Sequence, residues 1–269
     1  MARLFVPKFL ATLCTLVASC LLAHGEDEAS PKEPTFKLPD RSLYQKGRYV
    51  FEQNCMVCHG ERGNGKGEMA AQLSPKPRDF TSGLFKYRST PWGKLPTNED
   101  LLHTIREGRT NTAMGIFSHL REDELRAVVE YIKFLSRKWR KAENYAEAIP
   151  LPDPPDWFSD LQQLERRAKA GSKTFSTNCA TCHGADGDGR GPAAAALKDA
   201  AGDPIIPADL RQERLRSGNE LSDIYRVLLT GLNGTPMVSF AETLTDQQRW
   251  EVVAYILQLR LKHSASAAQ

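Results

Sequence analysis

Apolar residues recur at intervals of three and four along six stretches of the chain, and polar residues fill the positions between them. This spacing predicts amphipathic helices, each with one apolar face against a core. No stretch alternates convincingly between apolar and polar residues, as a half-buried strand does, so the pattern predicts an all-α fold. The predicted helices cover about residues 42–55, 97–108 and 121–139, and then 160–179, 219–231 and 245–259.

The six helices belong to two copies of one module, because a shift of 124 residues superposes the beginning and the end of the first set on the second, and between them the shift changes by a few residues, which marks loop insertions. Internal similarity of this kind indicates a duplicated structural unit. We define repeat 1 as residues 42–139 and repeat 2 as residues 160–262. The superposed residues include Gly47 and Gly171, Phe51 and Phe175, Asn54 and Asn178, and a series of four glycines at 60, 63, 65 and 67 that falls on 184, 187, 189 and 191.

Each copy is about 100 residues long, which is an ordinary size for a small domain. Four prolines between 150 and 155 indicate a semi-rigid linker between the copies. The expected order is a Pro- and charge-rich, disordered leader at 26–40, a first domain at 41–140, the linker at 141–159, a second domain at 160–263 and a tail at 264–269.

The N-terminus has the features of an export signal. Arg3 and Lys8 are positively charged, and residues 9–23 form a short, almost uncharged apolar run. Small residues at Ala23 and Gly25 suit cleavage before Glu26, so we expect residues 1–25 to be a signal peptide. The mature chain would then lie in the periplasm or another extracytoplasmic compartment. An uncleaved N-terminal anchor is the alternative.

A lipid anchor is a second alternative at the same segment. Val17-Ala18-Ser19-Cys20 resembles a bacterial lipobox, in which Cys20 becomes the lipidated first residue. The apolar Leu21 and Leu22 that follow fit a continuing signal core better. Apart from an uncleaved signal, lipidation of Cys20 is the remaining possible membrane attachment, since no later stretch is long and apolar enough to span a bilayer.

The cysteines indicate the chemistry of the chain. Two of the six lie in the predicted signal, and the other four form Cys55-Met-Val-Cys58-His59 and Cys179-Ala-Thr-Cys182-His183. Cys-x-x-Cys-His is the attachment signature of haem c, in which two thiols form thioethers and the adjacent histidine ligates the iron. Zinc sites usually combine nearby cysteine pairs, and a thioredoxin-type pair needs a βαβ setting, so neither alternative fits well.

Both repeats resemble class I cytochrome c domains. The resemblance rests on CxxCH followed by glycine, a glycine-rich loop, a Pro-x-Asp turn, a methionine after a glycine-containing segment and a final amphipathic helix. It implies a few helices wrapped round one covalently bound haem, with histidine and methionine as the axial ligands of the iron. The chain is therefore predicted to hold two haems, with His59 and His183 as proximal ligands.

The distal ligands follow by elimination and from the repeat. Met114 lies 59 residues after Cys55, and Met237 lies 58 residues after Cys179. Both follow a glycine and a threonine at the same spacing, so we predict that these two methionines ligate the iron. The other candidates lack a matched partner in the repeat or a suitable position, and they are Met56, Met69, His103, His119 and His263.

Two further features of the resemblance concern the surroundings of these ligands. The family often has proline directly after the ligand methionine, whereas Gly115 and Val238 stand there in this chain, which puts the rigidity of the methionine loops in question. In the family a proline carbonyl often accepts the N–H of the proximal histidine. The turns that begin at Pro77 and Pro207 resemble that feature, with an ordinary proline loop as the alternative.

Charge is distributed unevenly along the chain. Residues 36–140 hold 19 Lys and Arg against 12 Asp and Glu, whereas residues 141–269 hold 14 against 17. Either the basic half docks an acidic partner, through candidates Arg62, Lys66 and Arg109, or the two halves attract each other. The chain has no strongly basic domain with interleaved aromatic residues, so nothing indicates nucleic-acid binding.

Histidine and methionine together would close both axial positions of the iron, which favours electron transfer over catalysis. We therefore expect an electron carrier rather than an enzyme, with membrane or periplasmic oxidases and reductases as partners. An electron-entry subunit of a larger oxidoreductase complex is the first alternative. A dihaem peroxidase is the second, and it would need one iron with an open or switchable position.

Overall fold

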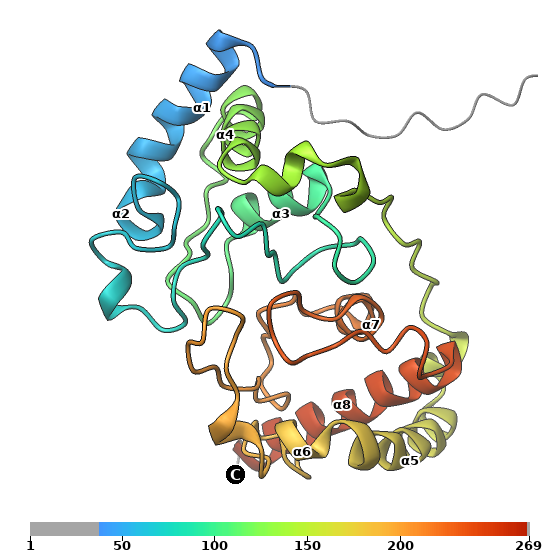
Figure 1. The fold of residues 1–269 in the computed structure, drawn as a ribbon. Coiled ribbons are helices and arrows are strands. Elements are labelled where there is room, and N and C mark those ends of the chain that lie inside the picture. Colours follow the sequence, from blue (N-terminus) through green and yellow to red (C-terminus); the bar gives the residue numbers. More distant parts are fainter. Residues whose placement is uncertain (1–37, 268–269) are drawn as a thin grey trace, which may run out of the picture. The chain divides into compact units, whose positions relative to one another are not determined.

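Eight α-helices, joined by loops and short 3-10 helices, make up the part of the chain that the computed structural model describes, residues 38–267 (Figure 1). Within these residues the one β feature is an isolated bridge between Lys198 and Pro204. The prediction of an all-α fold is confirmed. The predicted signal peptide and Cys20 lie outside the described residues.

Repeat 1 contains four of the helices. Its 3-10 helices are η1 (Ala70–Gln72) and η2 (Arg137–Arg140), with η3 (Ala142–Asn144) just beyond. The α-helices are α1 (Arg41–Asn54), α2 (Met56–His59), α3 (Asn98–Glu107) and α4 (Glu122–Phe134).

Repeat 2 reproduces the same order after the proline-rich linker. The linker contains η4 (Asp156–Ser159), and η5 (Ala194–Ala196) takes the place that η1 has in repeat 1. The α-helices are α5 (Leu161–Asn178), α6 (Ala180–His183), α7 (Leu221–Thr230) and α8 (Asp246–Ala267), so α8 continues into the stretch that we expected to be a tail.

Side-chain caps fix where several helices begin. Asp40 accepts a hydrogen bond from the Leu43 amide at 2.8 Å, and Asp160 caps α5 in the same way. A capping box begins α3, in which Thr97 and Asp100 each accept from the other's backbone amide. Such caps satisfy amides that have no partner within the helix.

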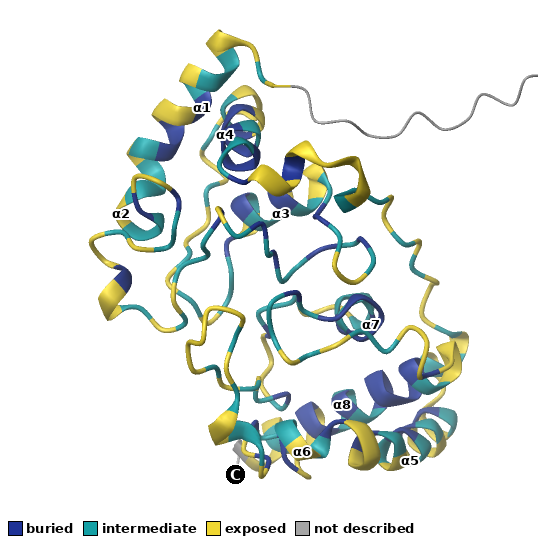
Figure 2. Ribbon diagram, viewed as in Figure 1, coloured by how far each residue is buried: buried dark blue, intermediate teal, exposed yellow. Residues whose placement is uncertain are grey.

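In each repeat the first helix packs across the last: α1 contacts α4, and α5 contacts α8. Superposed glycines make these crossings close, since a Cβ atom at Gly47 would overlap the carbonyl of Ala127, and one at Gly171 would overlap that of Glu251. Most of the buried residues of these last helices lie between 125 and 133 in α4 and between 249 and 260 in α8 (Figure 2). Phe51 and Phe175, matched in the repeat, are 0% and 1% exposed there.

The last helix of repeat 1 is shorter than its apolar pattern predicts. It ends at Phe134 instead of continuing to Trp139. Ser136 accepts a hydrogen bond from the Lys138 amide and begins the 3-10 helix η2, which places Trp139 in the core at 1% exposure. The apolar spacing alone did not distinguish a helix that continues from one that breaks and returns to the same core.

None of the helices in the described range is both long and apolar enough to cross a membrane. The described residues of both repeats lie in one compact unit, so the repeats share contacts within it.

Candidate functional site

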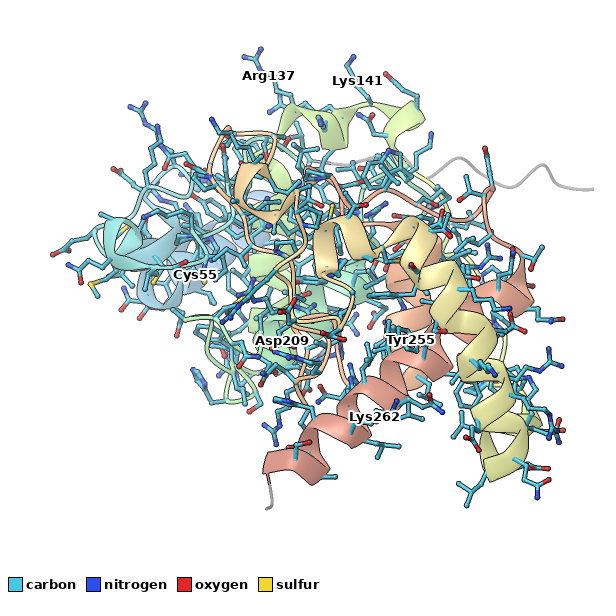
Figure 3. The ribbon with its side chains drawn as sticks, turned by 90° about the horizontal axis from the view of Figure 1, so that it is seen from below. Cys55, Arg137, Lys141, Asp209, Tyr255 and Lys262 are labelled. Carbon is cyan, nitrogen blue, oxygen red and sulfur yellow. The ribbon has the colours of Figure 1, made fainter. Side chains whose placement is uncertain are left out.

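Each CxxCH motif forms a single helical turn directly after the first helix of its repeat. Cys55 ends α1, and the amide of His59 donates to the carbonyl of Cys55 at 2.9 Å. Residues three and four apart lie on one face of a helix, so both thiols and the imidazole of the motif face the same way. Repeat 2 has the same bond, from His183 to Cys179, at 2.9 Å. Figure 3 labels Cys55 at this junction.

The glycine-rich loop folds back over this turn. Gly65 donates to the carbonyl of His59 at 2.8 Å, and Gly189 donates to that of His183 at 2.8 Å. Gly67 comes so close to the motif that a Cβ atom there would overlap the backbone of Val57 and Cys58. The superposed glycines therefore serve a close approach of two backbone segments.

Both histidines are oriented by a backbone carbonyl. The Nδ1 atom of His59 lies 2.9 Å from the carbonyl oxygen of Arg78, and that of His183 lies 3.1 Å from the carbonyl oxygen of Ala208. The predicted turns do hold the imidazoles, but the acceptor is the residue after each proline and not the proline itself. A proline carbonyl was expected because the family pattern names that residue, and the sequence alone does not reveal which carbonyl of the turn points inward.

Because a carbonyl oxygen can only accept, each of these contacts requires the imidazole to donate through Nδ1. Burial lowers the pKa of both histidines, although the carbonyl of Arg78 or Ala208 opposes this shift. A neutral imidazole that donates through Nδ1 has its Nε2 lone pair free, which is the form that ligates a metal. The ring of His59 is further fixed by stacking on Phe80, with centroids 4.4 Å apart.

The described cysteines are all free thiols, with no disulfide among them. Burial raises the pKa of Cys55 to about 12 and that of Cys179 to about 11, with a smaller contribution from the second cysteine of each motif. Neither thiol of a motif is used in a disulfide, so both are available for the thioether bonds that the motif predicts.

The two predicted methionines occupy loops with the same internal hydrogen bonds. The carbonyl of Met114 accepts from the amide of Arg109 at 3.1 Å, and the carbonyl of Met237 accepts from that of Leu232 at 2.8 Å. A threonine two residues earlier accepts from each methionine amide, at 3.1 Å in both loops. These hydrogen bonds close each loop and so restrict its movement, although no proline follows the methionine.

Each methionine also lies against the same core as the first cysteine of its repeat. Met114 and Cys55 pack on the cluster that contains Phe51, Val128 and Ile132. Met237 packs on the corresponding cluster of repeat 2, which includes Cys179 itself. The structure therefore brings the first cysteine of each attachment motif and the predicted methionine ligand of the same repeat to one apolar cluster.

The rival ligands are placed differently. Met69 is 38% exposed, and His103 and His119 are exposed as well. Met56 packs on the core cluster of repeat 1 but belongs to the CxxCH turn. His263 lies on the last part of α8, partly buried.

Of the three basic residues predicted to dock a partner, Arg109 is the one that is not exposed. Arg62 and Lys66 are exposed, as a docking role requires. The guanidinium of Arg109 instead lies over the ring of Tyr87, 4.5 Å from its centroid, and donates to Thr104. Its position one residue after the glycine that ends α3 turns it toward the protein.

Two buried arginine atoms fit the haem that the motifs imply. In the described chain, Nε of Arg109 and Nη2 of Arg260 are buried without a hydrogen-bond partner, and so is the indole nitrogen of Trp139. Buried donors normally have acceptors, and an unpaired one destabilises the fold. Haem c brings two carboxylate side chains, which are acceptors of the required kind, and one such arginine belongs to each repeat.

A family model for cytochrome c matches the chain twice, at residues 44–136 and 168–260. The chain belongs to the cytochrome c family. Its cofactor is therefore covalently bound haem c with its iron, and the two domains indicate two haems. This tandem cytochrome c carries electrons, as members of the family do.

Several known proteins resemble this cytochrome c along most of its length. A solved chain from the reducing HAO-like protein complex of Kuenenia stuttgartiensis has 36% sequence identity and a TM-score of 0.71, and the match covers 83% of this chain and 99% of that one. Thiosulfate dehydrogenase of Psychrobacter arcticus is 24% identical over 88% of this chain and 71% of its own. The cytochrome bc1 complex cytochrome c subunit of Corynebacterium diphtheriae is 23% identical over 82% and 68%.

Sequence reasoning missed the residues through which the repeats touch. Trp92 of repeat 1 is 41% exposed, and its ring lies against Gly231 of repeat 2. Arg88, 2% exposed, was not identified at all. Neither has a counterpart that the repeat reveals, and contacts between duplicated modules leave no periodic signal in the sequence.

Proposed function

We propose that this cytochrome c passes electrons between extracytoplasmic redox partners through two haems, each held by two thioethers, one histidine and one methionine. The residues are Cys55, Cys58, His59 and Met114 in repeat 1, and Cys179, Cys182, His183 and Met237 in repeat 2. When bound, haem iron supplies reversible one-electron transfer.

One observation supports this assignment above the others: both repeats build the same pair of supports for an iron. A backbone carbonyl 2.9–3.1 Å from Nδ1 holds the imidazole with Nε2 free. A closed loop holds a methionine against the same core as the attachment motif. Identical supports in both repeats favour two ligands of the same kind on both irons.

A methionine ligand on the iron favours electron transfer over reaction of a substrate at the metal. Met114 and Met237 would each hold an iron through the thioether sulfur, and a bound thioether would keep water and small substrates away from the metal. It would also raise the reduction potential above that of a site with two nitrogen ligands. The residues of this chain therefore serve to bind, orient and shield the cofactor.

The relatives support a place among redox complexes. One solved relative comes from a reducing HAO-like complex, and another relative is a cytochrome c subunit of a bc1 complex. We infer that this chain serves either as a shuttle or as the electron-entry subunit of such an assembly. Co-purification of a catalytic subunit with the full chain separates the subunit from the free shuttle.

Oxidation of thiosulfate is a second candidate, favoured by the likeness to thiosulfate dehydrogenase. A substrate that reacts at the iron needs an open or displaceable distal position, whereas both methionine loops here are closed in the same way. Carbon monoxide tests the difference, because it binds ferrous haem only where that position is free.

We expect the reduced wild-type protein to bind carbon monoxide slowly or not at all, and Met237→Ala to bind it at one haem. The exposed Met69→Ala is the matched control and should behave as the wild type. Rapid binding by the wild type, together with thiosulfate-dependent reduction, would instead identify an enzyme.

A further inference from the structure

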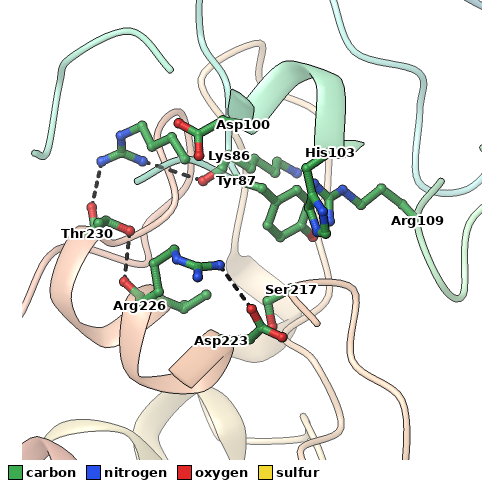
Figure 4. A pocket seen from close by; sticks show the side chains of 11 residues that line it. Lys86, Tyr87, Asp100, His103, Arg109, Ser217, Asp223, Arg226 and Thr230 are labelled. Atoms are coloured by element: carbon green, nitrogen blue, oxygen red, sulfur yellow. Dashed lines mark hydrogen bonds and ion pairs between the residues drawn. The ribbon is translucent and has the colours of Figure 1, made fainter. Parts of the chain in front are cut away.

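The loop that holds Met237 is attached to the other repeat. Arg88 of repeat 1 donates through Nη2 to the carbonyl of Thr230 at 2.5 Å and through Nη1 to that of Gly231 at 3.2 Å. Thr230 is the last residue of α7, so both acceptors lie where the helix passes into the methionine loop. Thr230 lines the same pocket as Lys86 and Asp100 of repeat 1 (Figure 4).

The guanidinium of Arg88 is suited to such a link. Burial lowers its pKa to about 10, which leaves it protonated at neutral pH, and Asp100 opposes that shift. A charged donor bound to two carbonyls forms stronger hydrogen bonds than a neutral one. Removing it would leave the carbonyl of Thr230 without this donor, and the carbonyl of Gly231 with only the 3.3 Å hydrogen bond from the Thr230 hydroxyl.

A second link lies inside the loop itself. The side-chain amide of Asn233, 3% exposed, uses both of its ends on repeat 1. Its oxygen accepts from the amide of Gly93 at 3.0 Å, and its nitrogen donates to the carbonyl of Lys94 at 3.0 Å. Asn233 follows Leu232, whose amide closes the loop on the carbonyl of Met237 at 2.8 Å.

Close packing leaves this loop little freedom. Gly231 has a φ of 64°, and a Cβ atom there would lie 2.6 Å from two carbons of the Trp92 ring. The side chain of Trp92, in repeat 1, thus fills the space beside Gly231, the first residue of the loop. Hydrogen bonds and packing act on the same few residues.

The methionine loop of repeat 1 has a weaker link in return. Asn111, which precedes Met114 by three residues and has a φ of 56°, donates to the carbonyl of Arg214 in repeat 2 at 3.0 Å. Its side chain is exposed. One exposed hydrogen bond therefore holds the first loop from outside, whereas four at buried side chains hold the second.

We propose that repeat 1 positions the distal ligand of repeat 2: Arg88 and Asn233 clamp the Met237 loop, so that Met237 is exchanged less readily at its iron than Met114. This inference rests on the proposed function, because it requires that both methionines are ligands. Arg88 and Asn233 are positioning residues, since they act through the loop and not on the iron.

Displacement of methionine by imidazole in the oxidised, full-length protein tests the clamp. The near-infrared band of the Met–Fe(III) bond disappears as imidazole binds, and Met114→Ala and Met237→Ala assign each kinetic phase to its haem. In the wild type we expect the Met114 phase to be faster. Asn233→Ala and Arg88→Lys should each accelerate the Met237 phase by about tenfold, the size expected for loss of one charged or two neutral buried hydrogen bonds.

Asn111→Ala provides the crossed control, because it should accelerate the Met114 phase alone. The inference is overturned if neither Asn233→Ala nor Arg88→Lys changes the Met237 phase, or if both phases change equally, as a general loosening of the fold would produce. A wild-type protein without the near-infrared band would overturn the proposed ligands themselves and the clamp with them. If Arg88→Lys does not fold, Asn233→Ala decides the question alone.

Discussion

The Nδ1 atom of His59 lies 2.9 Å from the carbonyl oxygen of Arg78, 19 residues further along the chain. Repeat 2 has the same relationship between His183 and Ala208, at 3.1 Å. Because a backbone carbonyl holds each imidazole, its orientation depends on the turn that presents the carbonyl. The stability of these two turns therefore determines how well the proximal side of each site is preorganised.

An aspartate holds the turn in repeat 2 and makes it sensitive to acid. The side chain of Arg211 hydrogen-bonds to Asp209 and holds the pKa of that carboxyl well below its usual range. A lowered pKa in the folded state stabilises the protein above the unfolded pKa of about 4, and this stability is lost as the pH falls further.

We expect Asp209→Asn to lower the free energy of unfolding at neutral pH by up to about 1 kcal/mol, the upper end for a solvent-screened pair. The difference from the wild type should shrink below about pH 4. Chemical unfolding followed across this range measures both. The exposed Asp203→Asn is the control, and an equal response in the two variants would mean that the Arg211 pair contributes nothing.

At the crossing of α5 and α8, replacing a helical glycine by alanine is expected to destabilise the protein. Glycine to alanine inside a helix ordinarily stabilises it by up to about 1 kcal/mol. At Gly171 the added Cβ atom would meet the carbonyl of Glu251, so α5 and α8 must separate. We expect Gly171→Ala to destabilise the protein by about 2 kcal/mol, as overpacking does.

Thermal or denaturant unfolding of Gly171→Ala checks this, with Ser172→Ala, one position along the same helix, as the control. A stabilised Gly171→Ala variant would show that the crossing can widen without cost.

Much of this fold could be predicted because each helix has its own local signals. The stripe through Val128 and Ile132 and the cap at Thr97 are properties of short segments, and both led to the observed helices. The duplication added what one copy could not: Met114 became the preferred candidate through its partner Met237.

The rest depended on which atoms face each other in three dimensions. The break after Phe134 returns Trp139 to the same core, so the apolar pattern does not register it. The carbonyl of Arg78, rather than that of Pro77, faces His59 because of how one turn is oriented. The contacts of Arg88 and Asn233 join segments about 140 residues apart, and such pairs have no signature in a single sequence.

The exposed basic residues of repeat 1 give a prediction about recognition. Arg62 and Lys66 lie in the loop directly after the first CxxCH motif, and both are exposed. If this loop docks an acidic partner, Arg62→Glu with Lys66→Glu should slow bimolecular electron transfer by about tenfold at low salt. The difference should fall as salt increases, since exposed charges are screened beyond about 10 Å at 0.1 M.

Stopped-flow measurements across a salt series test this with a purified redox partner. Lys141→Glu changes the same type of charge at an exposed position beyond α4 (Figure 3) and serves as the control. A rate that does not respond to salt or to the double variant would assign the charge asymmetry to folding or solubility.

The central claim is that two methionines ligate two irons, and the near-infrared spectrum of the oxidised, haem-loaded protein tests it most directly. The account predicts a Met–Fe(III) band that loses about half its intensity in Met114→Ala, about half in Met237→Ala, and disappears when both are replaced, because each repeat contributes one of two equivalent centres. Met69→Ala should leave the band intact. A band that survives the double replacement, or a wild type that has none, would contradict the account.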